Sequence, residues 1–232
     1  MGVVRILADS LRFFASNLGR IVPLCLPFIL CSMFFGYLLK VLWPPGAMGG
    51  VIFVNSYVPL VADLFFYPIY TGALIVFMAS RTAGESPGNG EILRTALSVW
   101  WPFFLLNLVV TILVVIGLFL FIIPGIWLMV RLVFSKFLLV LNHVAPIDAM
   151  RQSLVLSKSR FWLIFKCLYV VIVSVFLLNV LVGLVIAQLG SGLIVIVVLA
   201  SVFGILSLYL TVVMFRIFML VVDEDISVEA TQ

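Results

Sequence analysis

The chain has 232 residues, of which 66% are hydrophobic and 9% are charged, and its formal net charge is +4. Soluble domains are nearer half apolar and a quarter charged, so this composition excludes a water-soluble globular fold. It predicts an all-α integral membrane protein with a single polytopic domain over residues 1–232.

Six apolar runs are long enough to cross a bilayer, which requires about 20 mainly apolar residues per helix. The first run follows an N-terminal segment that contains three Arg and one Asp, and no small-residue cleavage site follows it. A retained helix is therefore expected there rather than a cleaved signal. The six predicted transmembrane helices cover 21–42, 57–80, 102–123, 126–144, 161–188 and 193–221.

Three shorter segments have the residue spacing of amphipathic helices. Residues 3–18, 91–100 and 146–158 carry apolar side chains three or four positions apart, with polar residues between them. Helices of this kind lie along the membrane interface, and each of these leads directly into a predicted span. The predicted apolar stripes are Val4, Leu7, Leu11, Phe14 and Leu18; Leu93, Leu97 and Trp100; and Ile147, Met150 and Leu154.

The order of these segments predicts three copies of one unit, an interfacial helix followed by a two-helix hairpin. Pro124 and Gly125 are expected to form the corner of the middle hairpin, because Pro lacks a backbone donor and Gly tolerates unusual dihedral angles. Small residues in the last two spans (Gly183 and Ala187, Ala200 and Gly204) predict close packing of the third hairpin. The repeat-like units cover 1–80, 89–144 and 146–222, a tight turn is expected at 190–192, and a short acidic tail covers 223–232.

Basic residues are concentrated on one set of connections. The N-terminal segment and the loops at 81–101 and 145–160 carry them, whereas 43–56, 124–125 and 189–192 carry none. By the positive-inside rule, both termini and all three interfacial helices are predicted to be cytoplasmic. The same residues also suit contact with anionic lipid. This predicted interfacial basic face consists of Arg5, Arg12, Arg20, Arg94, Arg151, Lys158 and Arg160.

Asp63, Arg131 and Lys136 lie well inside predicted spans, whereas Lys40, Lys166 and Arg216 lie nearer span ends, where a long basic side chain reaches the interface. Asp63 and Arg131 each lie about six residues from the outer end of a span, or roughly 9 Å below the outer boundary. They are a candidate buried ion pair, serving either as a structural clamp or as part of a polar cavity that opens outward. Lys136 lies near the middle of its span with no acid at the same depth. Together with His143 and Asn107 it is a candidate polar path or lipid contact.

The sequence carries no pattern typical of an enzyme or a metal site. It has one His and three Cys without ligand spacing, and it lacks the GxSxG, HExxH and P-loop motifs. We therefore predict no catalytic residue, no cofactor and no bound metal. Nucleic acid is not an expected partner, because membrane orientation accounts for the net charge.

The block IIPGIWLMVRLVFSKFLLVLNHVAPIDAMRQSLVLSKSRFW, residues 122–162, contains Pro-Gly, Val-Arg-Leu, Pro-x-Asp-Ala with a following Ser, and a basic residue before Phe-Trp. This block and the six-span layout resemble the YciC-like family of bacterial inner-membrane proteins. The chain is similar also to the membrane part of membrane-anchored glycerophosphodiester phosphodiesterases. It departs from the family pattern at Lys136, Asn142 and His143. The matched positions are Pro124, Gly125, Arg131, Pro146, Ala149, Ser153, Phe161 and Trp162.

The resemblance implies a bacterial inner-membrane location and an envelope-related role, but it names no reaction, and the phosphodiesterase catalytic domain is absent. The leading expectation is a non-enzymatic protein that supports envelope integrity. It would do so by engaging phospholipid or as the membrane partner of a lipid-trafficking protein. One alternative is a small transporter or channel that uses Asp63, Arg131 and Lys136. Another is a structural scaffold. The expected partners are membrane phospholipids, another envelope protein or a second copy of the chain.

Overall fold

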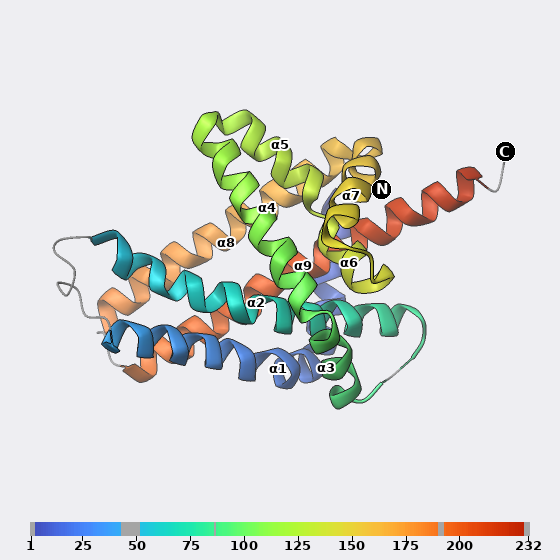
Figure 1. The fold of residues 1–232 in the computed structure, drawn as a ribbon. Helices are drawn as coiled ribbons and strands as arrows, with labels where there is room; N and C mark the ends of the chain where they lie inside the picture. The colour runs from blue at the N-terminus through green and yellow to red at the C-terminus, as the bar shows by residue number, and fades with distance from the viewer. Residues whose placement is uncertain (1–2, 43–51, 86, 190–192, 230–232) are drawn as a thin grey trace.

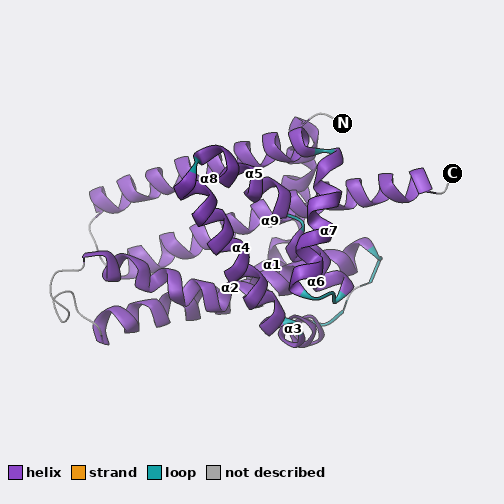
Figure 2. Ribbon diagram, turned by 45° about the horizontal axis from the view of Figure 1, so that its top comes forward, coloured by secondary structure: helices purple, strands orange, loops and turns teal. Residues whose placement is uncertain are grey.

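The protein is described by a computed structural model that covers residues 3–42, 52–85, 87–189 and 193–229. Every regular element in these ranges is a helix (Figure 2). Six segments within them are long and apolar enough to cross a membrane, which confirms the all-α class and the helices of a multi-pass membrane protein. These segments are Val3–Leu39, Ala62–Thr82, Trp100–Leu120, Ile122–Asn142, Phe161–Leu184 and Ser201–Asp223.

The helices follow the predicted order, with two differences in extent. The predicted interfacial segment 3–18 is not a separate helix but continues into the first span. The predicted acidic tail continues the last helix, and its final residues, 230–232, lie outside the described residues, as does the predicted turn at 190–192. The described helices are α1 Val3–Leu42, α2 Ile52–Thr82, α3 Asn89–Ser98, α4 Trp100–Leu120, α5 Ile122–Leu132, α6 Ser135–Asn142, α7 Pro146–Ser159, α8 Phe161–Leu189 and α9 Leu193–Glu229.

Short-range signals explain where several helices begin and end. Pro146 opens α7, where its missing N–H has no helical partner to lose, and Asp148 complements the positive end of the helix dipole. His143 ends α6 with φ 52°, in the left-handed region that terminates many helices. Gly84, with φ 78°, follows the end of α2 in the same way.

Consecutive long helices pack side by side: α1 along α2, α4 along α5, and α8 along α9 (Figure 1). Both chain ends lie toward the same end of the long helices. Among the candidate spans, α2 is central and α8 is peripheral, because 61% of the most apolar stretch of α2 is buried against 17% for α8. The apolar side chains that α8 leaves exposed suit contact with lipid.

The packed core lies toward the end of the molecule that holds the termini. It forms where the first turns of α1, the second half of α2, α6 and the second half of α9 meet. Aromatic rings of α6 and α9 pack edge to face or tilted there, with centroids 5.4–5.8 Å apart. The core includes Ile6, Phe14, Leu74, Met78, Phe134, Phe137, Leu139, Val213 and Ile217.

The three predicted apolar stripes match only in part the faces that the short helical segments bury: Phe14 is buried, and Leu7, Leu18 and Met150 pack against the core. Val4, Leu97 and Ile147 of those stripes are 80%, 49% and 65% exposed. Periodicity locates an apolar face, but it does not say whether that face meets protein or lipid. The faces that contact the bundle mix apolar, small and polar residues: Ile6, Ser10, Phe14 and Asn17 in α1; Ile92, Ala96 and then Val99 in and after α3; and Ala149, Ser153 and Ser157 in α7.

The corner between α4 and α5 also differs from the prediction. The turn is made by Phe121, whose extended backbone (φ −157°, ψ 138°) separates the two helices. Pro124 and Gly125 lie instead in the first turns of α5. Pro124 is tolerated because the first N–H groups of a helix have no internal partner. Gly125 is buried against α4, where a Cβ atom would lie 2.5 Å from Leu118 Cγ.

Candidate functional site

The fourth span is interrupted near its middle, between α5 and α6. A helix end leaves backbone carbonyls without their usual partners, which is unfavourable in a membrane. Here hydroxyl groups provide replacements. Ser153 Oγ of α7 donates to the Arg131 carbonyl at 2.7 Å. Ser157 Oγ lies 3.1 Å from the same carbonyl and 2.7 Å from the Ser153 carbonyl of its own helix, so its single proton is divided between these two acceptors. Ser135 Oγ donates to the Leu132 carbonyl at 2.6 Å. Serine hydroxyl groups therefore provide hydrogen bonds to the carbonyls at the break, and two of these serines belong to a neighbouring helix.

The side chain of Arg131 is only half-buried, yet its Nε atom is buried without a hydrogen-bond partner in the described part of the chain. Its guanidinium carbon lies 5.3 Å from the centroid of the Trp127 ring, a cation–π contact within the same helix. The predicted ion pair with Asp63 is not present among the described residues. The hydrogen bonds that the structure shows for Arg131 are made by its backbone carbonyl.

Asp63 has hydroxyl partners instead of a cation. Its Oδ1 atom accepts from Tyr70 Oη at 3.2 Å and from Ser32 Oγ of α1 at 3.4 Å. The predicted span began at residue 57, whereas α2 begins at Ile52, so Asp63 lies about three turns from the start of its helix. Depth matching also ignores rotation about the helix axis, and here the carboxylate is oriented toward α1.

The residues predicted to form a polar path do not contact one another in the structure. Lys136 Nζ donates to Thr211 Oγ1 of α9 at 3.3 Å and lies 5.2 Å from the Phe137 ring centroid. His143 is exposed at the end of α6. Asn107 is half-buried in α4, and no hydrogen bond joins its side chain to another described residue. No described contact links Lys136 to Arg131 or Asp63, so these groups do not line one pathway.

The predicted basic residues are all exposed to the surroundings of the bundle. Three of them lie on α1, and the others lie on or directly after the short helices α3 and α7. Exposure leaves these cations accessible to water, to anionic lipid or to a partner. The exposed residues are Arg5, Arg12, Arg20, Arg94, Arg151, Lys158 and Arg160.

The first turns of α1 are held against the bundle by polar contacts. Tyr209 Oη of α9 donates to the Leu7 carbonyl at 2.9 Å. Arg216 of α9 forms an ion pair with Asp9 at 3.2 Å. A third contact joins α2 to α1, from Arg81 to Asn17 at 3.3 Å. The N-terminal part of α1 is therefore docked on α2 and α9 along its inner face.

A cavity of about 390 Å³ lies beside this contact, between α1, α2 and α9. Its size is within the range of small-ligand sites. Thr82, Arg216 and Asp223 are exposed at its mouth. Deeper in, Ser10 is 1% exposed, and its Oγ atom has no hydrogen-bond partner in the described structure. The remaining lining is apolar: Phe13, Met78, Val212, Phe215, Met219 and Leu220.

Sequence reasoning does not select Ser10 or Arg216. The available signals were a Ser at the position between Ile6 and Phe14 on one helical face, and a lone Arg in the last apolar run. Both are common in membrane helices, since Ser hydrogen-bonds within helices and Arg extends toward the interface. Only the packing of α1 on α9 shows that they border one cavity.

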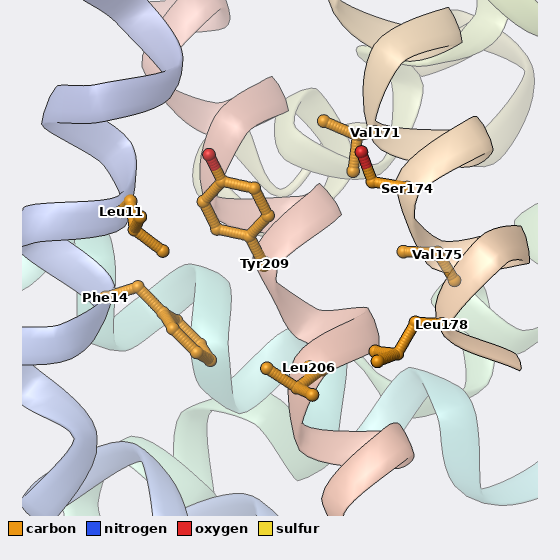
Figure 3. A pocket seen from close by; sticks show the side chains of 8 residues that line it. All are labelled: Leu11, Phe14, Val171, Ser174, Val175, Leu178, Leu206 and Tyr209. Atoms are coloured by element: carbon orange, nitrogen blue, oxygen red, sulfur yellow. The ribbon is translucent and has the colours of Figure 1, made fainter. Parts of the chain in front are cut away.

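A second opening of about 120 Å³ lies on the other side of the α1–α9 contact (Figure 3). Its polar atoms are already partnered: Tyr209 Oη donates to Leu7, and Ser174 Oγ donates to the Val170 carbonyl of its own helix. The opening is therefore an apolar groove without a free polar group among its described lining residues. It is lined by Leu11, Phe14, Val171, Ser174, Val175, Leu178, Leu206 and Tyr209.

Comparison with protein-family models, with curated proteins and with solved structures gave no match to this chain. The function is therefore argued from the residues and geometry described above.

Proposed function

We propose that this chain is a non-enzymatic protein of the bacterial inner membrane that supports cell-envelope integrity by engaging phospholipid. It acts either alone or as the membrane partner of a lipid-trafficking protein. The observation that carries the proposal is the cavity between α1, α2 and α9, whose walls are apolar and whose mouth is charged. A phospholipid has the same division between apolar chains and a charged head group. The resemblance of residues 122–162 to the YciC-like family supports the envelope role.

The proposed arrangement in the membrane is three hairpins, each preceded by a cytoplasmic interfacial helix. Side-by-side packing of consecutive long helices supports the hairpins, and both ends of the chain lie toward one end of the bundle. The exposed basic residues on α1, α3 and α7 support a cytoplasmic position for that end.

This orientation gives a direct expectation for reporter fusions in a bacterial host. Green fluorescent protein fused after residue 232 should fluoresce, because it folds in the cytoplasm. Alkaline phosphatase inserted at residue 47 should be active, because it requires the oxidising periplasm. The same phosphatase inserted at residue 87 is the matched control and should be inactive. Activity at residue 87 with none at residue 47 would contradict the proposed orientation.

Lipid engagement is tested by affinity purification from native membranes in a mild detergent, with both lipids and proteins identified by mass spectrometry. Relative to a six-helix membrane protein of similar size purified in parallel, we expect enrichment of one phospholipid class or of one envelope partner. If neither the lipid composition nor the protein composition differs from that control, the proposed function is wrong.

A further inference from the structure

The cavity between α1, α2 and α9 is lined by a buried polar group, Ser10 Oγ, that has no hydrogen-bond partner among the described residues. Ser10 Oγ is buried and makes no hydrogen bond in the described structure, although a hydroxyl removed from water is unfavourable without one. Most mid-helix serines bond to their own helix, as Ser174 and Ser207 do here. The Ser10 hydroxyl is thus available to donate to an acceptor inside the cavity.

The charges at the mouth restrict the chemistry of the ligand. Arg216 is 43% exposed and pairs with Asp9, which is 32% exposed. Asp223 is also exposed at the mouth, and no described side chain pairs with it. The three groups together carry one net negative charge. A head group with only a negative charge meets repulsion here, whereas one that carries both a phosphate and an ammonium finds a partner for each.

Resting on the proposed function, we propose that this cavity binds a glycerophospholipid with a phosphate and a primary amine, of the phosphatidylethanolamine class. Arg216 holds the phosphate and Asp223 holds the ammonium. Ser10 donates to an ester carbonyl, and one acyl chain follows the apolar wall. Each polar group of the cavity then has a partner of matching chemistry.

The ion pair between Arg216 and Asp9 competes with the ligand. A guanidinium binds carboxylate and phosphate groups through the same kind of N–H donor, so Asp9 competes with the phosphate for Arg216. Removing Asp9 and removing Arg216 both break the ion pair, but they have opposite consequences for the lipid. Loss of Asp9 frees the cation, whereas loss of Arg216 removes it. A purely structural ion pair would make the two variants equivalent.

The test measures lipid binding to the full chain in dodecylmaltoside by native mass spectrometry during titration with dioleoyl phosphatidylethanolamine. Arg216→Gln should weaken binding about tenfold or more, the value of a charge-assisted hydrogen bond. Asp9→Asn should strengthen binding about two- to fivefold, the value of an exposed ion pair. Thermal unfolding of both variants is recorded in parallel, because each loses the same contact. Equal effects of the two variants on lipid binding would overturn the proposal.

The ligand class is tested with three further probes. Wild-type protein should bind dioleoyl phosphatidylglycerol about tenfold more weakly, and Asp223→Asn should abolish that preference. Glycerophosphoethanolamine, which lacks acyl chains, should not bind. Ser10→Ala should weaken phosphatidylethanolamine binding severalfold. Ser207→Ala should leave it unchanged, because Ser207 bonds to its own helix and lines neither opening. If phosphatidylglycerol binds equally well, the amine assignment is wrong. If all variants keep wild-type affinity while lipid enrichment persists in native membranes, this site is wrong and the proposed function stands.

Discussion

Replacing Gly125 with Ala is expected to lower the thermal stability of the detergent-solubilised protein strongly. An added Cβ atom would lie 2.5 Å from Leu118 Cγ and 2.6 Å from the Leu118 backbone nitrogen. A side chain can change rotamer, but a backbone atom moves only with its helix, so α5 must separate from α4. Overpacking costs about 1–3 kcal/mol, or more where backbone must shift. We expect a midpoint roughly 2–12 °C lower for a chain of this size.

Two other glycines provide graded controls for this prediction. At Gly117, which faces Gly125 across the two helices, the nearest atom would be 3.0 Å from the new Cβ, so Gly117→Ala should cost less. At Gly183 in α8, no described atom lies within 4 Å. Gly183→Ala should leave stability unchanged or raise it, because Ala favours helix over Gly. Thermal unfolding followed by circular dichroism measures all three variants. A Gly125→Ala midpoint at or above that of Gly183→Ala would refute the close helix contact.

Removing both serines that cover the break between α5 and α6 is expected to have the second large effect. In Ser153→Ala/Ser157→Ala the Arg131 carbonyl keeps neither hydroxyl donor, and the substitutions preserve the small side chains that pack α7 on the bundle. An unsatisfied buried carbonyl costs about 1–3 kcal/mol. In either single variant the remaining serine can still donate. The loss in the double variant should therefore exceed the sum of the two single losses.

A double-mutant cycle on thermal midpoints tests this coupling. Ser174→Ala is the matched control, because Ser174 is exposed on α8 and bonds only to its own helix. It should change the midpoint little. Additive losses in the cycle, or a double variant as stable as Ser174→Ala, would show that the two serines do not act together on the broken helix.

The same serines show which features of the structure can be predicted from the sequence and which cannot. Ser153 belongs to the block that resembles the YciC-like family, and the helix that carries it was predicted from its apolar spacing and from Pro146. Its function as a hydrogen-bond donor to the Arg131 carbonyl could not be predicted, because the break lies inside an apolar run without Pro or Gly. A helix interrupted by its tertiary surroundings leaves no local signal.

The predicted packing of small residues illustrates the same limit. Gly204 of α9 approaches Ile29 of α1, where a Cβ atom would lie 2.9 Å from Ile29 Cγ2, rather than packing on α8. No described atom lies within 4 Å of the Cβ position at Gly183. The side chains of Ala187 and Ala200 lie outside the described residues. Small residues indicate that some helix approaches closely, but which helix depends on the arrangement of the whole bundle.

Composition and local sequence patterns correctly predict that the protein has helices long and apolar enough to cross a membrane, and roughly where in the chain they lie. Composition requires a bilayer, and run length and local end signals place six spans and the short helices α3 and α7, because these properties depend on neighbouring residues along the chain. Tertiary structure decided which side of each helix faces protein. In the folded protein Asp63 bonds to Tyr70 rather than to Arg131, and Phe121 forms the corner between α4 and α5. Lys136 bonds to the Thr211 hydroxyl, and Ser10 and Arg216 line the same cavity. Packing against other helices sets the rotation of each helix about its axis, and hydropathy alone could not predict that rotation.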